Sequence, residues 1–352
     1  MFIGILLVII SVLLFSLVIF IHELGHFITA KLSGVKVNEF AIGMGPAIFK
    51  IQKKETLYAI RLFPIGGYCS MEGEDSESNN TDSFSQKSVY KRILIVAAGA
   101  IMNIVLAFVF MILILSQQEQ FASTTISKFS ENAVTNQCGL QVGDTIKYID
   151  GYHICTYTDI GFMLAINTDL KSNIVVDRNG KEIELNNVQF ASKENNDGKT
   201  ILVKDFYVMP MEKNIGTIIT QTFKEMSSNI RITYATIIGM VTGKLSFNEV
   251  SGPVGIVTII SNAASEGLKV NFLTALNNII MIMMILSINL GLFNLLPIPA
   301  LDGGRLVFLI IEAIKGSPVN PKYEGLIHTV GFIILMLILL AVSINDIIKL
   351  FS

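Results

Sequence analysis

The sequence predicts a polytopic α-helical membrane protein with four transmembrane helices, a β-hairpin and an inserted β-rich domain. Its 352 residues are 51% hydrophobic and only 15% charged, and the mean hydropathy of +0.60 is far above that of a typical soluble domain. Four apolar stretches reach the roughly 20 residues that a membrane-spanning helix needs. A long, more polar segment with short β-like runs separates the second stretch from the third.

The four predicted spans are residues 1–20, 93–115, 272–296 and 326–344. A cleaved signal peptide is the alternative interpretation of the first span. Such peptides begin with a basic region, however, and no Lys or Arg precedes Lys31 here. The first stretch is therefore predicted to stay in the protein as a transmembrane helix.

The distribution of Lys and Arg predicts the orientation in the membrane, because short cytoplasmic loops are enriched in both. The loop between spans one and two is basic, with Lys31, Lys36, Lys50, Lys53, Lys54, Arg61, Lys87, Lys91 and Arg92. Arg305, Lys315 and Lys322 follow span three, so that loop is expected on the same side. Both termini and residues 117–270 are then extracytoplasmic. A net charge of −2 without a basic block gives no indication of nucleic-acid binding.

Residues 40–68 alternate between apolar and polar side chains around positions 48–51 and 57–62, which predicts a β-hairpin. We expect this hairpin to end in a turn at residues 64–67, which read Pro-Ile-Gly-Gly. The next segment, residues 71–88, is acidic and rich in Ser and Asn. It is predicted to be a flexible cytoplasmic linker.

The outer segment divides into two parts. Residues 124–209 contain short β-like runs separated by turn signals, which indicates a compact β-rich domain. Residues 214–268 have a helical, amphipathic pattern, and we expect these helices on the outer membrane surface. The apolar run at 250–265 is too short to span and is predicted to be interfacial. The predicted domains are 1–116, 117–210, 211–270 and 271–352.

The three cysteines are Cys69, Cys138 and Cys155. Cys69 is expected on the cytoplasmic side, so only the other two could form a disulfide. We expect the cysteines to be small buried hydrophobic residues, with such a disulfide as the alternative, and no CxxC metal spacing occurs.

The sequence HELGH at residues 22–26 carries the predicted chemistry. Residues four apart share one helical face, so His22 and His26 can bind one zinc ion. Glu23 would then face the activated water and accept its proton as a general base. A histidine pair lining a helix bundle is the simpler alternative, but it would leave Glu23 in hydrocarbon without a partner.

A catalytic zinc ion needs a third protein ligand and an open position. His153 is expected on the other side of the membrane. His328 is expected to pack in or cap span four. Asp302, which follows the third span near Pro297 and Pro299, is the better candidate, because both prolines interrupt a regular helix there. Alone, Asp302 could equally belong to a helix-end turn.

HELGH in the first span, NLLPIPALDGG after the third and a domain between spans two and three resemble the site-2 proteases, the zinc intramembrane metalloproteases. The closest likeness is to the bacterial type with one extracytoplasmic PDZ domain. The resemblance implies that His22, His26 and Asp302 are zinc ligands and that Glu23 is the catalytic base. It also implies a location in the bacterial plasma membrane, with the active site towards the cytoplasm.

Further motifs carry the same resemblance. Asn294, Pro297 and Pro299 match the pattern that helps this family to hold substrate, and Asn103 matches a second-span signature in which Ala100 replaces the usual proline. Residues 43–46 and 60–71, with Gly66 and Gly67, are similar to the family's membrane-associated β-hairpin. A hairpin edge near a metal could pair with an unwound substrate strand. An ordinary cytoplasmic hairpin is the alternative. Residues 139–154 are similar to the core of a PDZ domain, which would bind peptides or exclude bulky substrates.

The expected function is zinc-dependent cleavage of a single-pass membrane protein or signal peptide within the bilayer. The resemblance implies a preceding cut by a site-1-type protease, and anti-sigma factors, remnant signal peptides or pheromone precursors as substrates. Two other classes remain open. A membrane scaffold with a structural zinc site would normally need a fourth ligand, and an ion transporter often shows internal repeats that this sequence lacks.

Overall fold

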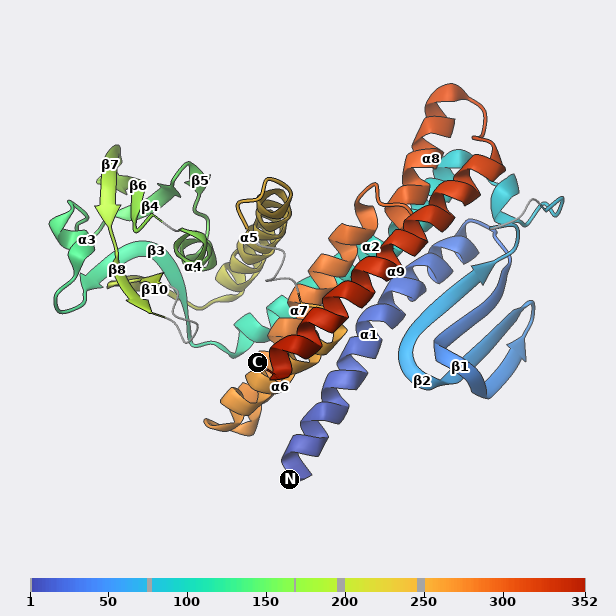
Figure 1. Cartoon of the computed structure of the whole chain (residues 1–352), viewed down its shortest axis with the longest axis horizontal. Helices are drawn as coiled ribbons and strands as arrows, with labels where there is room; N and C mark the ends of the chain where they lie inside the picture. The colour runs from blue at the N-terminus through green and yellow to red at the C-terminus, as the bar shows by residue number, and fades with distance from the viewer. Residues whose placement is uncertain (1, 75–77, 168, 195–199, 246–250, 352) are drawn as a thin grey trace. The chain divides into compact units, whose positions relative to one another are not determined.

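The computed structural model describes residues 2–74, 78–167, 169–194, 200–245 and 251–351. The chain forms two compact units, one made of residues 1–110 and 247–352 and the other of residues 111–246 (Figure 1). The first contains the long apolar helices and the second contains most of the β-strands.

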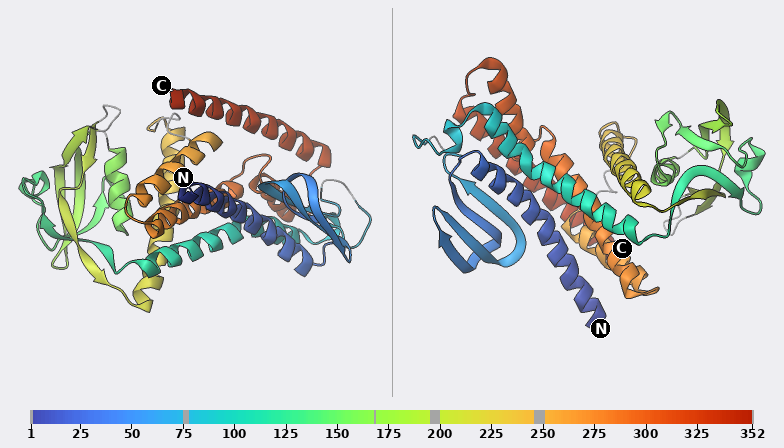
Figure 2. Two further views of the ribbon diagram at one scale, coloured as in Figure 1. Left: turned by 90° about the horizontal axis from the view of Figure 1, so that it is seen from below. Right: turned by 180° about the vertical axis from the view of Figure 1, so that it is seen from behind.

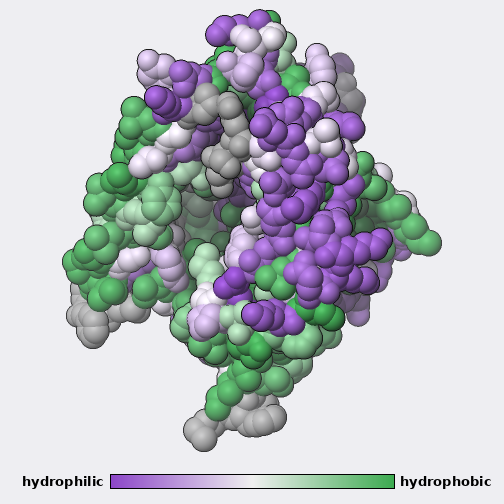
Figure 3. Space-filling view, turned by 90° about the vertical axis from the view of Figure 1, so that its right-hand side faces the viewer, coloured by the Kyte–Doolittle hydropathy of each residue, from purple (hydrophilic) through white to green (hydrophobic). Residues whose placement is uncertain are grey.

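Among the described residues, four helices are long and apolar enough to cross a membrane, which confirms the four predicted spans as helices. They are α1 (Phe2–Leu32), α2 (Val89–Gln117), α7 (Phe272–Leu295) and α9 (Pro321–Phe351). Helix α1 is longer than the predicted span of residues 1–20, because it continues through the polar HELGH motif as far as Leu32. On the face shown in Figure 3, hydrophobic residues cover much of the surface and lie on either side of a hydrophilic band.

Small residues allow α1, α2 and α7 to approach one another closely. A Cβ atom on Gly25 of α1 would lie 2.4 Å from the carbonyl oxygen of Ala98 of α2. A Cβ atom on Gly291 of α7 would lie 2.9 Å from that of Ala100. Such close backbone contacts are typical of packed transmembrane helices. They hold the HELGH end of α1 firmly against α2.

The predicted hairpin is present, but its turn was predicted at the wrong place. Strand β1 (Val37–Lys53) and strand β2 (Thr56–Met71) connect through Lys54 and Glu55, and residues 64–67 lie inside β2. Both strands bend, and residues 39–42 pair with 67–70 on one side and with 57–60 on the other. Gly43, Gly45 and Gly66 have positive φ angles, so they serve a bend within the strands rather than the hairpin turn.

The polar segment after β2 is more ordered than a flexible linker over residues 78–88. It contains the short 3₁₀ helix η1 (Phe84–Gln86), and the ring of Phe84 is buried in a cluster with Val35, Ile95 and Leu309. The expectation of a flexible linker therefore does not hold for these residues, because one apolar side chain anchors them. Residues 75–77 of the expected linker lie outside the described residues.

Two further helices lie in the first unit. Helix α6 (Pro253–Leu268) packs against α7, where a Cβ atom on Gly267 would lie 2.4 Å from the Cα atom of Ala275. Helix α8 (Asp302–Lys315) follows the third span, where no helix was predicted. It is amphipathic, with Leu309 buried and Lys315 exposed. This 14-residue helix was not predicted, because it begins directly after the segment in which Pro297 and Pro299 interrupt a regular helix.

The second unit is a β-rich domain with an attached helix. Its main sheet has the strand order β10-β3-β4-β6-β7, and the short strand β5 pairs with β4. The elements are β3 (Gln120–Phe129), α3 (Val134–Gln137), β4 (Thr145–Ile149), β5 (Tyr152–His153), α4 (Tyr157–Ile166), β6 (Lys171–Arg178), β7 (Lys181–Gln189), β8 (Ala191–Glu194), β9 (Thr200–Val203), β10 (Phe206–Glu212) and α5 (Ile215–Val241).

Helix α5 is tied to α4 by polar contacts. Arg231 of α5 lies 2.9 Å from the fully buried carboxylate of Asp159, and Thr158 donates a hydrogen bond to Glu225. Cys138 and Cys155 in this unit are free thiols, as is Cys69 in the other unit.

Candidate metal centre

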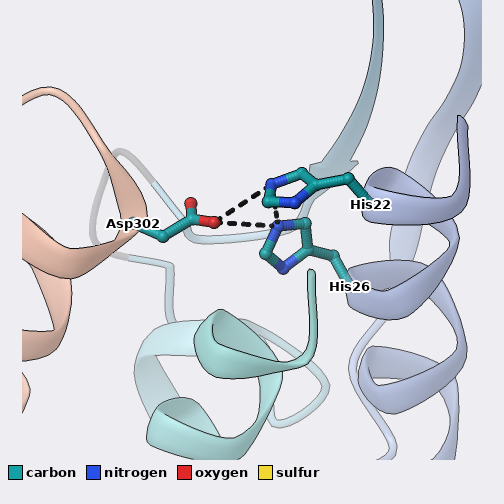
Figure 4. A group of neighbouring side chains, drawn as sticks. All are labelled: His22, His26 and Asp302. Carbon is teal, nitrogen blue, oxygen red and sulfur yellow. Dashed lines mark hydrogen bonds and ion pairs between the residues drawn. The ribbon is translucent and has the colours of Figure 1, made fainter. Parts of the chain in front are cut away.

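Three side chains from two segments that are far apart in the sequence converge on one point (Figure 4). Helix α1 provides His22 and His26, and the first residue of α8 provides Asp302. The Asp302 Oδ2 atom lies 3.1 Å from His22 Nε2 and 3.3 Å from His26 Nε2, and the two Nε2 atoms are 3.2 Å apart. Both histidines are 8% exposed. The structure therefore brings together the three residues that the sequence predicted as metal ligands.

The orientation of His26 is set by α2. Its Nδ1 atom lies 2.9 Å from the carbonyl oxygen of Ile95. A carbonyl oxygen can only accept a hydrogen bond, so Nδ1 carries the proton and the lone pair is on Nε2. That lone pair faces Asp302, as metal ligation requires.

His22 is held by Asn103 of α2. The Asn103 side-chain amide lies 3.3 Å from His22 Nδ1, and Asn103 Oδ1 has no hydrogen-bond partner among the described residues. A 180° rotation of this amide would bring Asn103 Oδ1 within hydrogen-bond distance of His22 Nδ1. The Nδ1–H group would then donate to the buried oxygen, and the lone pair of His22 would be on Nε2. The role of Asn103 in substrate binding stays a prediction, and the structure adds that its amide contacts a histidine.

Gly99 makes room for both histidine rings. A Cβ atom at this position would lie 2.3 Å from His26 Nε2 and 2.8 Å from His22 Cε1. No side chain larger than hydrogen fits there unless the rings move. This requirement could not be predicted from the sequence, because Gly99 lies on a different helix from the two histidines.

Asp302 is positioned by a tight segment between α7 and α8. Cβ atoms on Gly303 and Gly304 would lie 1.9 Å from the Leu296 carbonyl oxygen and 2.6 Å from that of Ile298. Ala300 has a φ angle of 72°, a conformation that costs a non-glycine residue about 1–3 kcal/mol. The double glycine therefore lets the chain fold back over the first turn of α8, and the preceding segment stores strain.

Glu23 lies beside this group, against strand β2. The backbone N–H of Cys69 donates a hydrogen bond to its carboxylate, and a Cβ atom on Gly67 would lie 3.5 Å from Glu23 Cγ. Glu23, His22, His26 and Asp302 line one cavity of about 270 Å³, together with residues from β2 and α9. The cavity can therefore hold a reacting group beside the glutamate.

The three ligand atoms fit a zinc ion. A tetrahedral site with bonds of about 2.0–2.1 Å has ligand atoms about 3.3–3.4 Å apart, and the separations here are 3.1–3.3 Å. Asp302 Oδ2 is buried and has no hydrogen-bond partner among the described residues, although two imidazole nitrogens face it. Three electron-rich atoms at this distance repel one another unless a cation or proton lies between them.

The six predicted substrate-binding residues, Asn103 of α2 and five others, are not among the described residues that line the cavity. Asn294 is buried near the end of α7, Pro297 and Pro299 lie in the following segment, and Gly66 and Gly67 lie in β2. Their sequence neighbours Tyr68, Cys69, Ala300 and Leu301 line it instead.

A metal centre of two histidines and one carboxylate, with an adjacent glutamate, belongs to the class of zinc hydrolases. The chain belongs to peptidase family M50, whose model matches residues 10–338. It is 39% identical to a Clostridium acetobutylicum protein named as a zinc metalloprotease, over 97% of each chain. It is 31% identical to the regulator of sigma-W protease RasP of Bacillus subtilis, over 98% of this chain and 99% of that one. The resemblance to site-2 proteases is thus confirmed, and the protein is a multi-pass zinc metalloprotease.

Proposed function

We propose that this protein is an intramembrane endopeptidase that cleaves single-pass transmembrane segments. In this proposal His22, His26 and Asp302 hold the zinc ion, and Glu23 is the general base. The convergence of the three ligand atoms, two of them on the membrane-spanning helix α1, is the observation that carries the proposal. Hydrolytic chemistry on such a helix is available at the depth where a transmembrane substrate lies.

The residues of this chain then have distinct tasks. A zinc ion bound here would acidify a water molecule and polarise the scissile carbonyl group. Glu23 accepts the proton from the attacking water and returns it to the leaving amine. The Cys69 N–H holds the carboxylate in place. Ile95 and Asn103 hold the two imidazole rings, which keeps the lone pairs on Nε2.

A helical substrate must unwind before it is cut, because its peptide bonds are hydrogen-bonded and shielded. Residues 67–71 of β2 pair with β1 on one side only, as far as the described residues show, and Glu23 lies next to them. We propose that the other edge pairs with an unwound substrate strand. Asn294, Pro297, Pro299, Gly66 and Gly67 would support this extended segment.

The β-rich domain is proposed to be PDZ-like and to act outside the membrane, either as a peptide-binding module or as a filter against bulky substrates. Both chain termini would lie on that side, and the metal centre would be nearer the cytoplasmic face of a bacterial plasma membrane. A site-1-type protease would cut the substrate first. The name of the Bacillus subtilis relative supports a regulatory substrate of the anti-sigma-factor type; remnant signal peptides and pheromone precursors are further possibilities.

Reconstituted protein and a synthetic transmembrane peptide provide the test. We expect cleavage inside the apolar segment, located by mass spectrometry and abolished by a zinc chelator. Glu23→Gln should keep zinc and lose about 10²–10⁴-fold in rate, as removal of a general base does. Asp302→Asn should lose zinc as well. Wild-type cleavage by Glu23→Gln, or a cut only in the flanking polar residues, would refute the proposal.

A further inference from the structure

The segment that positions Asp302 is held by α9 through one specific hydrogen bond. The backbone N–H of Ala300 donates to Nδ1 of His328, at 3.0 Å. Ala300 is the residue with the positive φ angle, two positions before Asp302. A backbone amide can only donate, so His328 Nδ1 must act as an acceptor. This contact therefore fixes the least favourable backbone conformation in the segment.

A second contact brings α9 against the same segment. Gly331 lies one turn beyond His328 and packs directly against Pro299. A Cβ atom at this position would lie 2.3 Å from Pro299 Cβ, so there is no room for a side chain. The ring of His328 also lies against Phe308 of α8, with ring centroids 5.7 Å apart. The imidazole is thus placed between the segment before Asp302 and the helix that begins with Asp302.

The apolar middle of α9 makes few contacts within this unit, although Asp346 near the end of α9 accepts hydrogen bonds from the start of α6. None of the residues in its most apolar 18-residue window is buried, and Leu337 and Leu340 are 61% and 58% exposed. Figure 2 shows α9 along the outer edge of the helices of its unit. General packing of α9 does not explain how Ala300 is held, whereas the His328 hydrogen bond does.

We propose that His328 is a positioning residue of the metal centre. It stabilises the positive φ angle of Ala300, and this conformation keeps Asp302 Oδ2 within reach of both histidine Nε2 atoms. The inference rests on the proposed ligand role of Asp302. It replaces the sequence-based expectation that His328 only packs in or caps its own helix.

Three substitutions separate this role from simple packing. Asn Oδ1 occupies the position of His Nδ1 and accepts a hydrogen bond, Gln places its oxygen near the Nε2 position, and Ala removes the acceptor. We expect His328→Asn to bind zinc within about threefold of wild type. His328→Gln and His328→Ala should bind at least about tenfold more weakly, as loss of a group that orients a metal ligand does.

A second substitution tests the mechanism. Glycine adopts positive φ angles readily, so Ala300→Gly in the His328→Ala background should recover part of the zinc affinity. Affinity is measured on the full-length protein in detergent by competition with a chromophoric chelator, and thermal melting checks the fold. Equal affinity of all three folded His328 variants, or no difference between Asn and Ala, would overturn the inference.

The Asp302→Asn variant separates this inference from the proposed function. If Asp302→Asn weakens zinc binding and the His328 variants do not, only the role of His328 is wrong. If Asp302→Asn leaves zinc affinity unchanged, the proposed ligand assignment is wrong and the inference falls with it. Because zinc binding is measured directly, both results are independent of finding a substrate.

Discussion

Gly99→Ala should remove zinc from the protein without touching any metal ligand. The added Cβ atom would lie 2.3 Å from His26 Nε2, whereas ordinary contacts begin at 3.4 Å, so the ring must move by about 1.1 Å. Metal-ligand distances vary by only about 0.2 Å between working sites. The displacement is several times that tolerance, and a loss of at least about 100-fold in zinc affinity is expected.

The assay compares zinc retention by the purified full-length protein at a series of chelator concentrations. Gly325→Ala is the matched control, because it makes the same change in α9, where a Cβ atom would meet nothing within 4 Å. Peptide cleavage should fall in parallel with zinc content. If Gly99→Ala retains zinc as tightly as Gly325→Ala, the role assigned to Gly99 is refuted.

Three further predictions concern the stability of the two units, measured on the full-length chain by thermal or chemical unfolding and, for Arg231→Ala, by limited proteolysis. Asp346→Asn should destabilise the first unit by about 1–3 kcal/mol, because the buried carboxylate of Asp346 accepts hydrogen bonds from two backbone amides at the start of α6; an unchanged melting curve would contradict this. Arg231→Ala should make the second unit more sensitive to proteolysis, because the fully buried Asp159 loses its charged partner; wild-type resistance would count against it. Burial raises the pKa of Glu225, so the folded state holds this proton at a pH where the unfolded state has lost it. The stabilisation by the protonated Glu225 is fully present below the ordinary carboxyl pKa and is lost as the pH rises through the raised pKa. The free energy of unfolding should therefore fall as the pH rises between these two pKa values. Glu225→Gln should flatten this pH dependence.

Much of this architecture could be predicted because it depends on local pattern. The four spans follow from apolar runs, and HELGH places two ligand candidates on one helical face whatever the rest of the chain does. Asp302 could be inferred because the prolines before it mark broken backbone at membrane depth. The ends of α1 and α9 were less predictable, since an apolar run marks the lipid-exposed part of a helix and not its full length.

The features that the sequence did not reveal depend on contacts between distant segments. Whether residues 64–67 form the hairpin turn depends on how β1 and β2 bend, and the glycines there serve a bend within β2. The need for Gly99 appears only when α1 lies against α2. The hydrogen bond from Ala300 to His328 joins two segments that no motif connects. No local motif marks any of these residues, and the role of each follows from a segment that is distant in the sequence and close in the fold.

The ligands of the proposed metal centre differ in how firmly they are held. His22 and His26 lie on one continuous helix, and α2 fixes both rings through Ile95 and Asn103. Asp302 follows a strained segment. Its conformation depends on the close approach of Gly303 and Gly304 to that segment and on the contacts with α9. A disturbance in α9 can therefore move the carboxylate while the histidine pair stays in place. Because zinc needs all three atoms about 3.3 Å apart, we expect a change in α9 to alter metal affinity through the position of the aspartate.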